Sequence, residues 1–116
     1  MKDDLNYVGH ILDCARRIQR HTLGITREAF DSNEILQLAI THLIQTAGEA
    51  ARKLTPAFRQ LHPQVPWNQI VGMRHRLVHD YLNIDIDVVW QVSTVDVPKL
   101  ISQLAPILSE SAGDAS

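Results

Sequence analysis

The residues best suited to chemistry lie close together near the middle of the chain. They are Arg74, His75, Arg76, His79 and Tyr81. RNA can be cleaved without a metal when one group moves the proton of the 2′-hydroxyl and a fixed positive charge stabilises the phosphate as it gains a fifth ligand. Histidine and arginine can supply these two functions. The cluster therefore indicates a candidate ribonuclease site built on Arg74 and His79.

The spacing around this cluster predicts a helix from Trp67 to about Asn83. On an ideal helix Arg74 and Tyr81 point in directions roughly 20° apart, into the apolar face. An arginine there needs a carboxylate or a groove that binds an anion, because burying its charge unpaired is costly. That apolar face consists of Ile70, Met73, Leu77 and Val78.

Arg74 and His79 are roughly 140° apart on an ideal helix, so one helix does not aim both at a single phosphate. Either the helix loosens near His79, or two copies of the segment meet across a symmetric dimer, and we favour the dimer. A purely structural interpretation stays open at this point. In it, Arg74 pairs with a carboxylate such as Glu49 and His79 caps the end of its helix.

Two other kinds of site are weaker. His75 and His79 are one helical turn apart and could share a metal, but only Asp80 lies nearby as a third ligand, so we predict no metal site. Cys14 has no neighbour that would lower its pKa and is expected to fill the core. The chain lacks a glycine-rich phosphate loop and a GxSxG elbow, which excludes the familiar nucleotide-binding and hydrolase folds.

The elements that must position the cluster are helical, and we expect an all-α, up-and-down four-helix bundle. The expected helices run from about 4 to 21, from the start signal Asp31-Ser32-Asn33 to about 54, from 67 to 83, and from 88 to about 108. Residues 26–30 read as a turn, and Thr55-Pro56 begins a short helical piece. Gly48, among the alanines at 47, 50 and 51, predicts a close helix approach.

Proline positions shape the expected C-terminal part. Pro98 predicts a kink or break after Val97, and Pro106 an early end of the last helix. Residues 1–108 form one domain, and residues 109–116 are expected to be a disordered tail.

The composition of the chain indicates its cellular compartment and limits the partners that it could bind. The 116 residues carry a formal net charge of -2, so the basic spot at Arg74 and Arg76 is local. A single cysteine cannot form an internal disulfide. The chain has neither an export signal at its start nor an apolar stretch of about 20 residues. We therefore expect a cytoplasmic protein with no membrane partner.

The segment Arg74-His75-Arg76-Leu77-Val78-His79-Asp80-Tyr81 resembles the RxxxxHxY signature of HepT-like toxins, a branch of the HEPN ribonuclease superfamily. Flanking segments are also similar to the family, and the likeness runs from about Glu34 to Ile107. The resemblance places Arg74 and His79 at the catalytic positions. His75 takes the variable polar position, where asparagine is more usual. The similar flanks are Ala47-Gly48-Glu49-Ala50-Ala51 and Tyr81-Leu82-Asn83-Ile84-Asp85 with Val88-Val89-Trp90.

The resemblance implies a homodimeric, metal-independent endoribonuclease whose motif helices line a shared cleft, with His75 and Glu49 as supporting residues. Its antitoxin would be a nucleotidyltransferase of the MntA type that uses ATP to attach AMP to Tyr81. The chain itself would need no cofactor, and its substrate would be RNA, with no DNA expected. Two alternatives remain open: a non-catalytic HEPN-like module that binds a nucleotide or a partner, and a structural dimerisation bundle.

Overall fold

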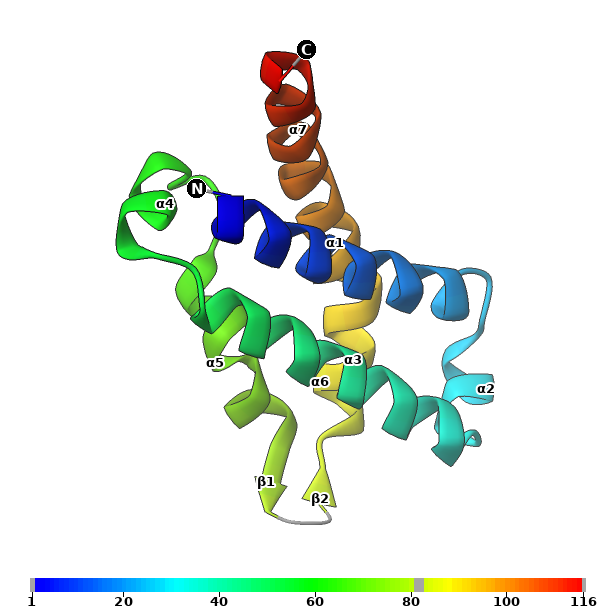
Figure 1. Ribbon diagram of the computed structural model, residues 1–116. Coiled ribbons are helices and arrows are strands. Elements are labelled where there is room, and N and C mark those ends of the chain that lie inside the picture. Colours follow the sequence, from blue (N-terminus) through cyan, green and yellow to red (C-terminus); the bar gives the residue numbers. More distant parts are fainter. Residues whose placement is uncertain (1, 81–82, 116) are drawn as a thin grey trace.

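The computed structural model describes residues 2–80 and 83–115 and belongs to the all-α class, as expected (Figure 1). Four helices form the bulk of it, and shorter elements connect them. The long helices are α1 (Lys2–Thr22), α3 (Glu34–Arg52), α5 (Trp67–Leu77) and α7 (Val97–Ala115). The shorter elements are α2 (Arg27–Asp31), α4 (Pro56–Leu61), β1 (Val78–Asp80), β2 (Asn83–Ile84), α6 (Ile86–Gln91) and the π-helical turn η1 (Val92–Asp96).

The bundle forms where α1 and α3 lie side by side and α6, η1 and α7 cross them as one continuous helix (Figure 1). Helix α1 buries an apolar stripe that recurs every three or four residues, as an amphipathic helix requires. Helix α3 buries the matching stripe, and α5 packs on its far end. The buried apolar residues of α1 and α3 are Val8, Ile11, Leu12, Cys14, Ala15, Ile18, Ile40, Ile44, Ala47, Ala50 and Ala51.

Local signals in the sequence set most helix ends. Asn33 accepts a hydrogen bond from the Leu36 amide at 3.0 Å and begins α3. Gly24, with φ of 79°, follows the end of α1 in the left-handed conformation that glycine adopts without strain. The turn expected at residues 26–30 is instead the short helix α2, because Thr26 accepts a hydrogen bond from the Ala29 amide at 3.1 Å.

A buried carboxylate joins the two ends of the first half of the chain. Asp4 is 3% exposed and accepts hydrogen bonds from both the amide and the hydroxyl of Thr55, at 2.8 and 3.0 Å. Thr55 in turn accepts a hydrogen bond from the Phe58 amide and begins α4. The start of α1 is therefore fixed to the segment that leads into α5.

The C-terminal helix differs from the expectation in two places. The sequence predicted a kink or a break after Val97, and a break does not occur. The π-helical turn η1 ends one residue before Val97 and widens the helix where Pro98 has no N–H to donate. Pro106 is exposed inside α7, and the backbone stays helical to Ala115, where the sequence had predicted a tail from Ser109.

The helix predicted from Trp67 to Asn83 is too long, because α5 ends at Leu77. At that point the Leu77 carbonyl accepts a hydrogen bond from the Asp85 amide at 2.7 Å. In a continuing helix this carbonyl would accept from the amide four residues later, so its bond to Asp85 does not allow the helix to continue. Strands β1 and β2 follow as an antiparallel hairpin that projects beyond the helices (Figure 1).

The expected close approach at Gly48 is confirmed. A Cβ atom built at Gly48 would lie 3.0 Å from the carbonyl oxygen of Ile70, so a bare glycine lets α5 lie directly against α3. Gly9, on α1, has no such neighbour within 4 Å. Gly48 thus sets the position of the helix that carries Arg74.

We expect Gly48→Ala to lower the free energy of unfolding by about 1 kcal/mol. Overpacking costs about 1–3 kcal/mol, and the better helix propensity of alanine offsets about 1 kcal/mol of that cost. Gly9→Ala is the matched control, and it should raise the free energy of unfolding by up to about 1 kcal/mol. Urea denaturation of both variants measures the difference, and an equal stabilisation of the two would contradict the close contact.

Cys14 is buried on α1, as predicted. Burial is the main cause that raises the pKa of its thiol, and the negative charge of Asp13 raises this pKa further. The thiol therefore stays protonated at neutral pH and acts as a small apolar side chain. Across the part of the chain that the structure describes, no helix is both long and apolar enough to cross a membrane.

Candidate functional site

Helix α5 carries the backbone of Arg74. Its neighbours one turn before and after along the chain are Ile70 and Leu77, which are 3% and 0% exposed. Met73 is buried as well, so the predicted apolar face of α5 is confirmed for these three residues. The side chain of Arg74 itself lies outside the described part of the structure.

His79 lies in β1, two residues after α5 ends, and not on the helix. Val78 pairs with Ile84 and Asp80 with Asn83, so β1 advances two residues while β2 advances one. This bulge makes His79 the extra residue of β1. The helical-wheel angle between Arg74 and His79 therefore does not apply. Of the two alternatives, the less favoured one, a helix that loosens near His79, is present in the backbone.

Asp85 fixes the base of this hairpin in two ways. Its amide donates to the Leu77 carbonyl, and its carboxylate accepts a hydrogen bond from the Val88 amide at 3.1 Å, which begins α6. One residue thus joins the end of α5, the end of β2 and the start of α6. The backbone position of His79 depends on this connection, because β1 directly follows Leu77.

Glu49 lies beside the contact of α3 with α5, since the neighbouring Gly48 meets the Ile70 carbonyl. Arg74 is one turn further along α5, a rise of about 6 Å. The Glu49 carboxylate is about half exposed and forms an ion pair with Arg52. The structure thus brings the backbones of Glu49 and Arg74 to neighbouring levels of two packed helices.

The other predicted site residues are placed as follows. His75 and Arg76 are exposed on the polar side of α5, as predicted. Within the described residues, no three His, Cys, Asp or Glu side chains gather in a way that could hold a metal ion, and the His79 side chain is outside that set. Tyr81, the predicted modification site, lies outside the described residues.

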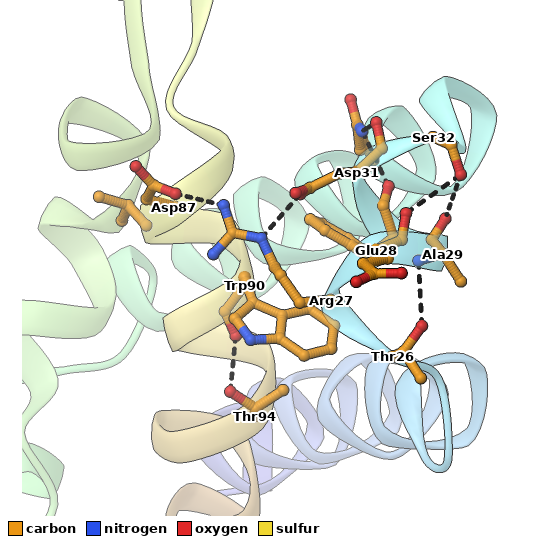
Figure 2. A network of polar contacts seen from close by, with 12 residues as sticks. Thr26, Arg27, Glu28, Ala29, Asp31, Ser32, Asp87, Trp90 and Thr94 are labelled. Carbon is orange, nitrogen blue, oxygen red and sulfur yellow. Dashed lines mark hydrogen bonds and ion pairs between the residues drawn. The ribbon is translucent and has the colours of Figure 1, made fainter.

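A polar network joins α2 to α6, the helix that directly follows the hairpin (Figure 2). Arg27 on α2 donates hydrogen bonds to Asp87 on α6 and to Asp31, the latter at 2.7 Å, and these bonds raise the pKa of Arg27 above its ordinary value. Exposed ion pairs contribute little to stability, because solvent screens the two charges. The rings of Phe30 and Trp90, 5.1 Å apart, join α2 to α6 by apolar contact. The network therefore orients α6 more than it stabilises it.

The profile of the family "Ribonuclease HepT-like" matches residues 11–107, from α1 into the second half of α7. The chain belongs to the HepT-like ribonuclease family. The match includes both Arg74 on α5 and the hairpin that carries His79. It confirms the family inferred from the RxxxxHxY spacing.

Curated relatives agree with this membership over most of their length. A candidate RNase of Caldanaerobacter subterraneus subsp. tengcongensis is 34% identical over 111 residues, covering 95% of this chain and 98% of the relative. A candidate RNase of Methanocaldococcus jannaschii is 32% identical over 99 residues, with 85% and 91% covered. A candidate ribonuclease HepT of Thermococcus cleftensis is 30% identical over 95 residues, with 82% and 86% covered. No solved structure matches the chain at the same stringency.

Sequence reasoning missed the residues that hold the hairpin of this HepT-like chain. Arg27 lies 60 positions from its partner Asp87, and no local pattern relates them. The expected helices leave Asp85 in the connection between 83 and 88, although its side chain accepts a hydrogen bond from the Val88 amide three residues later, which is a helix-start signal. That signal could have shown that a new helix begins at Ile86.

Proposed function

We propose that this chain is the toxin of a toxin–antitoxin pair and a metal-independent endoribonuclease. Arg74 and His79 are its catalytic residues, in a cleft shared by two copies of the chain. His75 and Glu49 support the site from α5 and α3. The observation that carries the proposal is the HepT-like match, which spans both motif residues at the RxxxxH spacing.

The proposed reaction needs only groups that the chain supplies. The His79 imidazole accepts the proton of the 2′-hydroxyl, and the freed oxygen attacks the adjacent phosphorus. The phosphorus loses its bond to the 5′-oxygen of the next nucleotide, and that oxygen takes a proton from water while the His79 imidazolium returns its proton to the solvent. The products are a cyclic 2′,3′-phosphate and a 5′-hydroxyl. The Arg74 guanidinium stabilises the extra negative charge on the phosphate oxygens as the fifth bond forms.

The bulge in β1 supports this division of roles. Bulges re-aim a side chain relative to the regular strand and are frequent next to active sites. Here the bulge falls on His79, and the helix that carries Arg74 ends two residues earlier. A base on the hairpin and a fixed cation on a core helix can approach one phosphate from different directions, which a single helix would not allow.

Regulation of the proposed toxin uses Tyr81. A nucleotidyltransferase antitoxin of the MntA type would catalyse attack of the Tyr81 hydroxyl oxygen on the α-phosphorus of ATP, releasing pyrophosphate. The product carries AMP two residues after His79. A phosphate attached there brings negative charge to the site that the substrate phosphate needs, so modification and RNA binding would exclude one another. The chain itself requires no cofactor.

The proposed dimer has a direct test. The hairpin projects beyond the helices of a single copy (Figure 1), and short two-stranded hairpins are only marginally stable alone, so a second copy would support it. Ile35 and Leu38 also leave apolar side chains exposed, at 82% and 50%, on one face of α3. Light scattering should give about twice the chain mass of 13.1 kDa. A monomer at micromolar concentration would contradict the shared cleft.

The experiment that tests the activity is cleavage of RNA by the purified chain in a buffer that contains a chelator. Single-stranded RNA should be cut, and the products should carry cyclic phosphate ends. A binding module without catalysis would retain the RNA intact, and a structural bundle would neither bind nor cut it.

A further inference from the structure

A cavity of about 300 Å³ opens between α5 and the first turns of α7. Its floor is apolar and comes from four helices, and the side chains that define it include Ala15, Ile18, Met73 and Leu100. This volume is at the lower end of the range of about 300–1,000 Å³ that is usual for small-ligand sites. The cavity is distinct from the hairpin that carries His79, but it shares helix α5 with Arg74.

The rim of this cavity is polar and comes from three elements. Helix α5 contributes Gln69 and Arg76, the end of η1 contributes Asp96, and α7 contributes Lys99 and Gln103. Among these described side chains, the two cations form no ion pair with the Asp96 carboxylate, and Gln103 donates a hydrogen bond to the Gln64 carbonyl at 3.2 Å. The rim therefore presents amide, carboxylate and cationic groups that are available to a ligand.

This combination of surfaces fits one chemical class. A nucleobase has apolar faces that pack against aliphatic side chains and an edge of hydrogen-bond donors and acceptors that amides and carboxylates complement. Arg76 and Lys99 outnumber Asp96 on the rim, so the local charge is positive in a chain whose formal net charge is -2. Positive charge beside an apolar slot suits the phosphate that accompanies a base.

We propose that this cavity is a base-binding subsite for the RNA strand, with Lys99 and Arg76 contacting a neighbouring phosphate. The inference rests on the proposed function, because it makes the cavity part of RNA recognition by the same enzyme. Arg76 and Met73 share α5 with Arg74, so a strand bound in the cavity lies against the helix that carries the catalytic arginine. The subsite sets which nucleotide precedes or follows the cut.

Binding of a fluorescently labelled oligoribonucleotide tests the subsite in the His79→Ala background, where the strand stays intact. Lys99→Glu should weaken binding by about tenfold or more, since a single base or phosphate site contributes on that scale. Lys2→Glu is the matched control, because Lys2 is also an exposed lysine, does not line the cavity, and changes the net charge equally. Equal weakening by both variants would reduce the effect to overall charge and overturn the proposal.

A second variant separates the base from the phosphate. Ala15→Leu fills the floor without changing charge, and it should weaken binding of the normal strand by about tenfold. A strand of the same length with abasic residues should bind this variant and its parent alike. If both strands bind Ala15→Leu and its parent equally, the base does not enter the cavity. Melting curves confirm that each variant is folded. If Ala15→Leu does not fold, the comparison of Lys99→Glu with Lys2→Glu still tests whether the rim of the cavity binds the strand.

The outcomes keep this inference apart from the proposed activity. If the wild-type chain fails to cut RNA while binding depends on Lys99 and Ala15, the ribonuclease proposal fails and the subsite stands. If the wild type cuts RNA and both variants bind it normally, the subsite alone fails. If free mononucleotides displace the labelled oligoribonucleotide at a concentration similar to its own, a single nucleotide fills the cavity. A change of oligomeric mass in Ala15→Leu or Lys99→Glu, without a change in RNA binding, would instead assign the cavity to the contact between copies.

Discussion

RNA cleavage by the His79→Ala variant is expected to fall by roughly a hundredfold to ten-thousandfold in a buffer with chelator, which is the usual contribution of one general acid–base group. The imidazole has no replacement in the variant, because the neighbouring His75 lies on α5 and not on β1. The fold should be retained, since the bulge in β1 is a feature of the backbone. Initial rates on single-stranded RNA measure the loss.

Arg74→Ala should lower the rate by a similar factor, roughly a hundredfold to a thousandfold, because removing one charge-stabilising group from a transition state has that effect. Arg74→Lys should recover only part of it, since an ammonium lacks the planar pair of donors that matches a phosphate. His21→Ala and Arg20→Ala are the matched controls, because both residues are exposed in the last turn of α1. Both control variants should cut RNA at the wild-type rate.

Two results would contradict this assignment in different ways. Undiminished cleavage by His79→Ala would remove His79 from the chemistry and leave the family match without its expected mechanism. Loss of wild-type cleavage on adding chelator would instead revive a metal site that includes His75 and His79. Either outcome is distinguished from misfolding by thermal melting of the same samples.

Much of the fold could be predicted because its signals are local. The side chains of Asn33 and Thr55 begin their helices by accepting hydrogen bonds from amides three residues later, so sequence alone reveals both starts. Gly48 could be interpreted in the same way, because small residues at helical spacing indicate a close contact even when the partner is unknown. The family signature needed only the types and spacing of residues 74–81.

The hairpin could not be predicted from the same signals. The helical apolar pattern continues through Leu77 and does not mark the end of the helix. The helix ends where the Asp85 amide, eight positions later, donates a hydrogen bond to the Leu77 carbonyl. Whether that contact forms depends on where α6 lies, and α6 is held by Arg27 on α2. The position of His79 thus follows from tertiary contacts, as does the cavity rim, whose residues come from α5, η1 and α7.

Tyr81→Phe tests regulation separately from catalysis. The variant should keep most of the ribonuclease activity, because in the proposed cleavage step the Tyr81 hydroxyl neither transfers a proton nor stabilises charge. It should nevertheless become insensitive to the nucleotidyltransferase antitoxin, since phenylalanine has no oxygen to receive AMP. Its ring retains most of the apolar surface of tyrosine, so the change is limited to the hydroxyl.

Co-expression with the antitoxin and intact mass measurement give the decisive comparison. The wild-type chain should gain mass in steps of one adenylyl group and lose its RNA cleavage, whereas Tyr81→Phe should do neither. Tyr7→Phe is the matched control, because Tyr7 is the second tyrosine of the chain and lies on α1 against His10, so this variant should be modified like the wild type. Mass gain that persists in Tyr81→Phe would move the modification to another residue. Loss of cleavage by unmodified Tyr81→Phe would make the hydroxyl part of the catalytic or RNA-binding site, and AMP would then inactivate the enzyme by occupying a group that the reaction itself uses.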